Sequence, residues 1–254
     1  MSARRADHGV AYWDRLATGF DEHVCHVLAE DRQRVVDRAL RDEARRLGAR
    51  KGGRAPVRIG DFGCGTGRAL PLLLRHFERV LAVDGSARCL EVARETAPDA
   101  GRVEFVEADL AAERLRLPRV EAGLCINVAL TPDETARARM LRNVARCVRP
   151  PGRLLLVVPA LESELLVRRR WRRWSGKPWP AQEGEDLVKG LVLVGGARTK
   201  LWMREELLLL ARQLRCRVAS IERVEYGWES ELVDPPRSMR APYPWDWLGV
   251  LERV

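Results

Sequence analysis

The order of apolar and polar positions predicts a chain that alternates between strands and helices from about residue 57 onward. Five short apolar segments have the length of strands, at 57–62, 79–83, 103–107, 121–127 and 153–158. Apolar residues at helical spacing lie between most of them, at 67–77, 86–97 and 132–148. Such alternation predicts right-handed crossovers between parallel strands, with helices on both faces of the sheet. The run at 154–158 is apolar at every position, which is typical of a central strand.

The hydrophobic pattern also predicts helices and strands toward both ends of the chain. Apolar residues at steps of three and four predict a helix over 22–48, before a linker rich in glycine at 51–56. Near the other end we expect a helix at 204–214 and strands at 216–226 and 245–251. Residues 160–200 fit no regular pattern and contain many Arg and Trp residues. We expect this looser segment to be an insertion over the functional site.

One helix has a sharp start signal. In Thr131-Pro132-Asp133-Glu134, the threonine offers an N-cap hydroxyl, the proline fits the first helical position, and the glutamate stands three residues after the cap. The sequence therefore predicts a capping box at Thr131.

Composition is that of an ordinary globular protein. Of 254 residues, 46% are hydrophobic and 32% are charged. The longest apolar stretch, 154–161, is far shorter than the roughly 20 residues of a membrane span, and the first residues lack the apolar core of a secretory signal. We expect a cytoplasmic protein with no membrane association. The six cysteines show no C-x-x-C spacing, which favours free thiols over a metal or redox centre.

The net charge of +9 raises the question of a polyanionic partner. All but four of the 45 basic residues are arginines, and they are spread along the whole chain. Because no block concentrates them, the charge does not by itself indicate a nucleic-acid-binding protein.

The strongest chemical signal is Asp61-Phe62-Gly63-Cys64-Gly65-Thr66-Gly67, where a predicted strand gives way to a helix. Glycines allow a tight turn and a close approach of a ligand to the backbone, beside the positive end of the helix dipole. In open α/β sheets this is the position of the ligand crevice. The motif therefore predicts a ligand site here.

The next predicted strand ends in Asp84, seventeen residues after Gly67. A carboxylate at this point can accept hydrogen bonds from both hydroxyls of a ribose, which indicates a nucleoside-type cofactor. A dinucleotide-dependent dehydrogenase is the nearest rival, but its G-x-G-x-x-G spacing fails, since Arg68 or Leu70 stands at the last position.

The chain resembles the class I S-adenosylmethionine-dependent methyltransferase family from about residue 10 to its end. The family motif D-x-G-x-G-x-G is matched at its four fixed positions, and Asp84-Gly85-Ser86 matches the acid after the second strand. The resemblance places Asp109 by the adenine amine, and it places an aromatic residue, Tyr12, over the methionine end. It implies S-adenosyl-L-methionine as cofactor and these binding residues: Tyr12, Asp61, Phe62, Gly63, Gly65, Gly67, Asp84, Gly85, Ser86, Asp109, Leu110 and Asn127.

The resemblance also implies the fold, a Rossmann-like, mostly parallel seven-stranded sheet whose last strand runs antiparallel beside the sixth. The turn at Arg149-Pro150-Pro151-Gly152 departs by one residue from the family's proline-glycine turn. Within one domain overall, we expect a helical cap at 1–50, the cofactor-binding core at 51–160, a cap or insertion near the substrate pocket at 161–203, and a final helix and strands at 204–254.

Three features remain open on sequence alone. Asn127, at the end of the fourth strand, either faces the methyl-transfer path or bonds to loop backbone. His23 and His26 flank Cys25 on the first helix, but their spacing does not fit a zinc site, so we expect no metal. In the arginine- and tryptophan-rich segment 168–174, Val167, Trp171 and Trp174 form a stripe of an amphipathic helix. We favour a cap over the substrate pocket for this helix, rather than an RNA surface.

These observations leave three functional hypotheses. The first is an enzyme that methylates a small molecule, with no catalytic residue assigned, because the sulfonium methyl is already activated and proximity is the main requirement. The second is a methyltransferase that acts on RNA or protein through its basic face. The third is a binding module that keeps the cofactor pocket without activity. The acceptor and the oligomeric state are not encoded in any motif.

Overall fold

The computed structural model describes residues 26–51, 56–180, 182–194 and 196–254. Seven strands form one sheet in the order β3-β2-β1-β4-β5-β9-β8. All neighbours pair in parallel except β9, which runs antiparallel to both β5 and β8. The predicted fold class is confirmed. The strands are β1 Arg58–Phe62, β2 Arg79–Asp84, β3 Val103–Glu107, β4 Ala122–Ile126, β5 Arg153–Pro159, β8 Cys216–Glu225 and β9 Trp245–Arg253.

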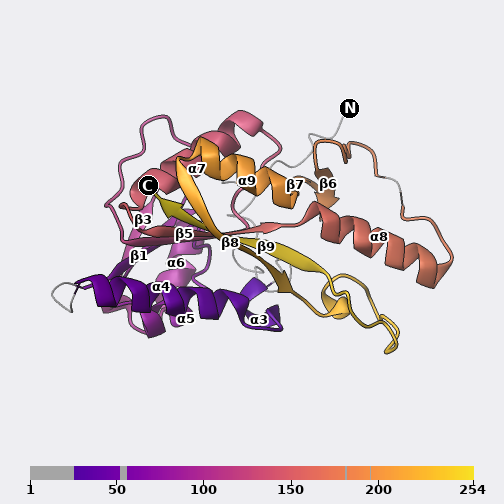
Figure 1. Cartoon of the computed structure of the whole chain (residues 1–254), viewed down its shortest axis with the longest axis horizontal. Helices are drawn as coiled ribbons and strands as arrows, with labels where there is room; N and C mark the ends of the chain where they lie inside the picture. Colours follow the sequence, from indigo (N-terminus) through magenta and orange to yellow (C-terminus); the bar gives the residue numbers. More distant parts are fainter. Residues whose placement is uncertain (1–25, 52–55, 181, 195) are drawn as a thin grey trace.

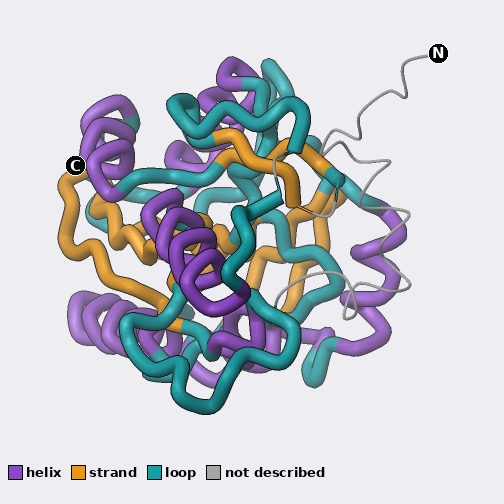
Figure 2. The backbone as a smooth tube through the Cα atoms, turned by 90° about the vertical axis from the view of Figure 1, so that its right-hand side faces the viewer, coloured by secondary structure: helices purple, strands orange, loops and turns teal. Residues whose placement is uncertain are grey.

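Helices cover both faces of this sheet (Figure 1). Apolar residues of α4, α5 and α6 pack with the strands in one buried cluster, and those of α7 and α9 pack in a second. Figure 2, turned by 90°, shows helices outside the strands on both sides. The α-helices of the described residues are α3 Val27–Glu30, α4 Val35–Lys51, α5 Leu70–His76, α6 Ala87–Thr96, α7 Glu134–Cys147, α8 Leu161–Ser175 and α9 Arg204–Gln213. Two short 3-10 helices are η2 Ala100–Arg102 and η3 Trp228–Ser230.

Close packing at the centre of the sheet depends on two glycines. The ring of Phe62 is fully buried, and a Cβ on Gly60 or Gly123 would lie 2.6 Å or 3.0 Å from its carbons. The side chain of Phe62 therefore belongs to the core, and only its backbone lies near the turn that follows β1.

The predicted first helix is interrupted. Asp31 is buried and accepts hydrogen bonds from the backbone N–H groups of Gln33 and Val36, at 3.3 Å and 2.9 Å. Arg34 adopts a left-handed conformation with φ of 51°. The prediction of one continuous helix over 22–48 is wrong within its described part, because the Asp31 side chain caps a new helix at Val35.

The start of α7 also differs from the expected capping box. The helix begins at Glu134, and its N-cap is Asp133, whose carboxylate accepts from the N–H groups of Thr135 and Ala136 at 2.9 Å and 3.1 Å. The Thr131 hydroxyl accepts instead from the N–H of Asp133. The predicted cap at Thr131 is wrong by two residues, because the carboxylate next to the helix takes the role of the hydroxyl.

The looser segment contains more regular structure than its pattern indicated. It forms α8 and a hairpin of β6 Leu191–Val194 with β7 Ala197–Lys200. In Figure 1, α8 extends away from the sheet. Along the predicted apolar stripe, Val167 is buried, Trp171 is half-buried and Trp174 is 40% exposed. The stripe is thus buried only over the first turns, because the last turn of α8 has fewer neighbours.

No helix among the described residues has both the length and the apolar character needed to cross a membrane. The cysteines of the described part are free and buried.

The turn between α7 and β5 gives a test of the packing. A Cβ at Gly152 would lie 2.0 Å from the carbonyl oxygen of Glu121 and 2.7 Å from that of Arg149, and neither backbone atom moves easily. We expect Gly152→Ala to lower the free energy of unfolding by about 1–3 kcal/mol or more, as overpacking does. Urea denaturation measures the change.

Gly48 in α4 is the matched control, because a Cβ there meets no atom within 4 Å. Gly48→Ala should raise the free energy of unfolding by roughly 0.5–1 kcal/mol through helix propensity. Equal effects of the two substitutions would contradict the packing described for Gly152.

Candidate functional site

A tight backbone turn follows β1 at the carboxyl edge of the sheet. Gly63, Gly65 and Gly67 have φ angles of +75°, +53° and +83°. The N–H groups of Gly63 and Cys64 both donate to the carbonyl of Val83 on β2, at 2.7 Å and 3.0 Å. A Cβ at Gly63 would lie 2.3 Å from a methyl carbon of Val128. The turn therefore requires glycine for both its conformation and its close packing.

The carboxylate of Asp84 joins this turn to the end of β2. One oxygen accepts from the N–H of Gly65 at 2.8 Å, and the other accepts from the N–H of Ser86 at 2.8 Å. The Ser86 hydroxyl caps α6 by accepting from the N–H of Cys89 at 3.1 Å. The structure thus brings together residues that the sequence analysis proposed separately, with Gly85 between two of them.

Asp61 is a buried acid at the base of the turn. It is 3% exposed, and its Oδ2 atom has no hydrogen-bond partner in the described part of the chain. Burial, and secondly the nearby charge of Asp84, raise the pKa of Asp61 to about 7. Burying an uncompensated carboxylate is costly, and a cationic ligand group would offset that cost.

Asp109 and Leu110 follow β3, the strand next to β2. Asp109 is exposed, and its carboxylate accepts from the N–H of Ala111 at 2.8 Å. Leu110 is buried, and its carbonyl accepts from the side-chain amide of Asn143 on α7 at 2.9 Å. The N–H of Ala108 donates to the carbonyl of Asp84 at 2.9 Å. This loop is therefore fixed against both the Asp84 turn and α7.

Asn127 contacts a buried acid that the sequence analysis did not identify. Its side-chain amide donates to Asp246 on β9 at 3.1 Å, while its own Oδ1 atom is buried without a partner in the described residues. Asp246 is 8% exposed. Burial raises its pKa to about 6, against the opposing effect of hydrogen bonds from Tyr226 and Asn127.

The register between β5 and β9 explains why Asn127 and Asp246 lie together. Asp246 lies near the start of β9 and pairs with Pro159, the last residue of β5. Because β9 runs antiparallel to β5, it begins where β5 ends. In the sequence, Asp246 is marked only by its position between Trp245 and Trp247. Both tryptophans are buried in the structure.

Some expected site residues cannot be placed. Tyr12, His23 and Cys25 lie outside the described residues. Within those residues, no group of three or more His, Cys, Asp or Glu side chains is arranged to hold a metal ion.

The part of the chain that contains the glycine turn matches a known protein family. Residues 59–152 match the model of a methyltransferase domain. This part of the chain is similar to methyltransferase domains. The match includes Asp61, the glycine turn, Asp84, Asp109 and Asn127, whereas Asp246 lies outside it.

A curated relative matches about half of the chain. The chain is 32% identical over 128 residues to trans-aconitate 2-methyltransferase of Acidovorax sp. (strain JS42); the match covers 46% of this chain and 47% of that protein. The matched part therefore spans about half the length of the curated relative.

Solved structures share the fold over nearly the whole chain. Magnesium protoporphyrin IX methyltransferase from Synechocystis PCC 6803, with bound SAH (S-adenosylhomocysteine), is 17% identical and aligns with a TM-score of 0.57 over 96% of this chain and 98% of that one. The 1,6-didemethyltoxoflavin-N1-methyltransferase of Burkholderia thailandensis, with bound 1,6-didemethyltoxoflavin and S-adenosylhomocysteine, is 19% identical, with a TM-score of 0.54 over 100% and 93%.

The buried Asp61 generates a prediction about stability and pH. Its pKa is raised in the folded state, so the folded protein binds more protons than the unfolded chain between about pH 4 and 7. Ionisation of Asp61 should therefore lower stability as pH rises through this window. A shift from 3.8 to about 7 corresponds to about 4 kcal/mol as an upper value.

Asp61→Asn removes the buried charge, and we expect it to raise the melting temperature of the ligand-free protein more at pH 8 than at pH 4.5. Thermal unfolding at the two pH values checks this. The same change in melting temperature at both would contradict a buried, uncompensated carboxylate.

Proposed function

We propose that the protein transfers a methyl group from S-adenosylmethionine to a small molecule. The observation that carries this proposal is the buried carboxylate oxygen of Asp61, which has no partner among the described residues and lies next to a glycine turn that Asp84 closes. Asp61 offers an acceptor for a cation, and Asp84 offers an acceptor for hydroxyl groups. The glycine turn between them lets a ligand approach the backbone closely.

The residues present fit the chemical groups of this cofactor. Its methionine end carries an ammonium group, which would neutralise Asp61. Its ribose carries two hydroxyls, which suit Asp84, because an ionised carboxylate is an acceptor with about four lone-pair sites on its two oxygens. By the family resemblance, Asp109 receives the adenine amine. Phe62 contributes backbone only, since its ring lies in the core.

The bound cofactor supplies a methyl group already activated on a sulfonium, so the chain mainly has to orient the two reactants. Asn127 follows β4, and Asp246 on β9 lies beside the carboxyl end of β5, so both are on the side of β1 away from Asp84 and β2. We assign Asp246 the role of accepting the proton of the hydroxyl or amine that is methylated. Asn127 holds this carboxylate in place.

We infer that the segment at 161–203 encloses the acceptor. The hydroxyl of Ser163 on α8 accepts from the N–H of Trp245 at 2.8 Å, and Glu162 accepts from the indole of Trp247 at 3.1 Å. These bonds tie α8 to both sides of Asp246. This arrangement supports a covered pocket and a small acceptor, in keeping with the compounds named for the similar enzymes.

Calorimetric titration with S-adenosylmethionine, S-adenosylhomocysteine and NAD tests the cofactor. We expect the two sulfur compounds to bind and NAD not to bind. Asp84→Asn should weaken their binding by about 1.5–3 kcal/mol, because an amide cannot replace all the acceptors of a carboxylate. Asp99→Asn, the same change at an exposed acid beside β3, is the control and should leave binding unchanged. Binding of NAD alone would overturn the proposal.

Asp246→Asn tests the transfer step with any acceptor for which the wild-type protein produces S-adenosylhomocysteine. We expect the turnover number to fall roughly 10²- to 10⁴-fold, as for loss of a general base. Cofactor affinity should not change. The wild-type rate should rise with pH through about 6, where Asp246 ionises, and the variant should lose that rise. An unchanged pH profile in the variant would exclude this role.

A further inference from the structure

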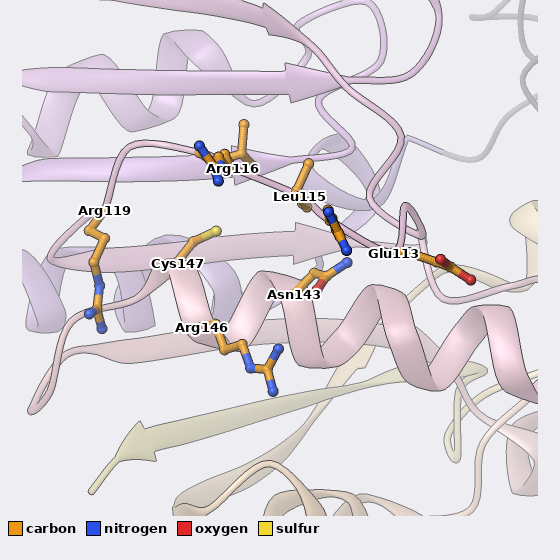
Figure 3. Close-up of a pocket in the computed structure, with 9 residues that line it drawn as sticks. Glu113, Leu115, Arg116, Arg119, Asn143, Arg146 and Cys147 are labelled. Atoms are coloured by element: carbon orange, nitrogen blue, oxygen red, sulfur yellow. The ribbon is translucent and has the colours of Figure 1, made fainter.

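A second site lies on the α7 side of the molecule. The loop between β3 and β4 runs alongside α7, and the two segments enclose a half-open groove of about 470 Å³ (Figure 3). The volume is within the range of ligand-binding pockets. Its lining includes Arg114, Arg116, Arg119, Asn143 and Arg146.

The four arginines of this groove have no counter-charge in the described part of the chain. None of them forms an ion pair or a hydrogen bond there through its guanidinium group, whereas Arg168 on α8 pairs with both Glu164 and Glu185. All four groove arginines are exposed. The one acid of the lining, Glu113, lies at the opposite end from Arg119 in Figure 3. The groove is therefore a concentrated positive surface.

The sequence of the loop explains why its arginines are exposed. In Arg114-Leu115-Arg116-Leu117 the residue types alternate, and both leucines pack against the buried cluster on the α7 face. With the leucines turned inward, Arg114 and Arg116 face outward. Arg146 adds a fourth charge from the last turn of α7.

The groove is also held in shape without a ligand. The side-chain amide of Asn143 donates to the carbonyls of Leu110 and Ala112, both at 2.9 Å. Arg139, one turn earlier on α7, donates to the carbonyl of Ala111 at 3.3 Å. These bonds fasten the loop to the helix, so a ligand meets a preorganised array of charges.

We propose that this groove binds the phosphate backbone of a single-stranded nucleic acid. Guanidinium groups match phosphate oxygens in geometry and charge. The arginines are exposed and distributed along the groove, which suits a chain of phosphates better than one enclosed ion. No aromatic residue lines the groove, so its contacts are to phosphates rather than stacked bases, and phosphate contacts do not distinguish between bases.

This site is separate from the proposed cofactor site, although the loop that forms it begins at Asp109. It also differs from the segment 168–174, where Arg168 is neutralised and Trp171 packs edge-on against Trp179 with ring centroids 6.0 Å apart.

The test is the binding of fluorescein-labelled 12-nucleotide homopolymers, by anisotropy, at several salt concentrations. The wild-type protein should bind oligo-U and oligo-A alike. Arg116→Ala/Arg119→Ala should weaken binding at least tenfold and lower the slope of log K against log salt by about 1.4, or 0.7 for each lost phosphate contact. The control, Arg172→Ala/Arg173→Ala, removes the same charge from two exposed positions on α8 and should change binding less than twofold.

Titration with S-adenosylhomocysteine shows that each variant is folded and that the two sites are independent. An equal loss of oligonucleotide affinity in both double variants would show that only the net charge of the protein matters, and it would overturn the proposal. Saturating binding of pyrophosphate that displaces the oligonucleotide at micromolar concentration would show a small-anion site instead. No binding of either oligonucleotide by the wild-type protein would also overturn it.

Discussion

The hydrogen bonds of the Asp84 carboxylate hold the candidate site together. This one side chain ties the N–H of Gly65, after β1, to the N–H of Ser86, before α6. The carbonyl of Val83, one residue earlier, accepts from the N–H groups of Gly63 and Cys64. Asp61 belongs to β1, where it is paired with both β2 and β4 and is buried at the base of this turn. Among the described residues, its Oδ2 atom has no hydrogen-bond partner.

Much of this arrangement could be predicted from the sequence, because the signals are local. The spacing of Asp61, the three glycines and Asp84 places them at the ends of neighbouring parallel strands, and the structure brings them together there. Helix starts were harder, since Thr131 and Asp133 offer competing caps and only their geometry decides between them. The interruption at Asp31 was missed for the same reason, because its apolar neighbours keep helical spacing across the break.

Contacts between distant parts of the chain could not be predicted from the sequence, because they leave no local signal in it. Asn127 and Asp246 are 119 residues apart, and they meet only because β9 runs antiparallel between β5 and β8. The positive groove has a similar origin. Arg114, Arg116 and Arg119 lie close together in the sequence, but Arg146 joins them only because Asn143 fastens their loop to α7. A count of charges along the sequence does not reveal such a surface.

The most direct test of the account is a crystal structure of the protein with S-adenosylhomocysteine. The account predicts the ammonium group of the ligand within hydrogen-bond distance of Asp61 and its ribose hydroxyls on Asp84, with the glycine turn unchanged. A ligand bound elsewhere, or one whose ammonium leaves the Asp61 carboxylate unpartnered, would contradict it.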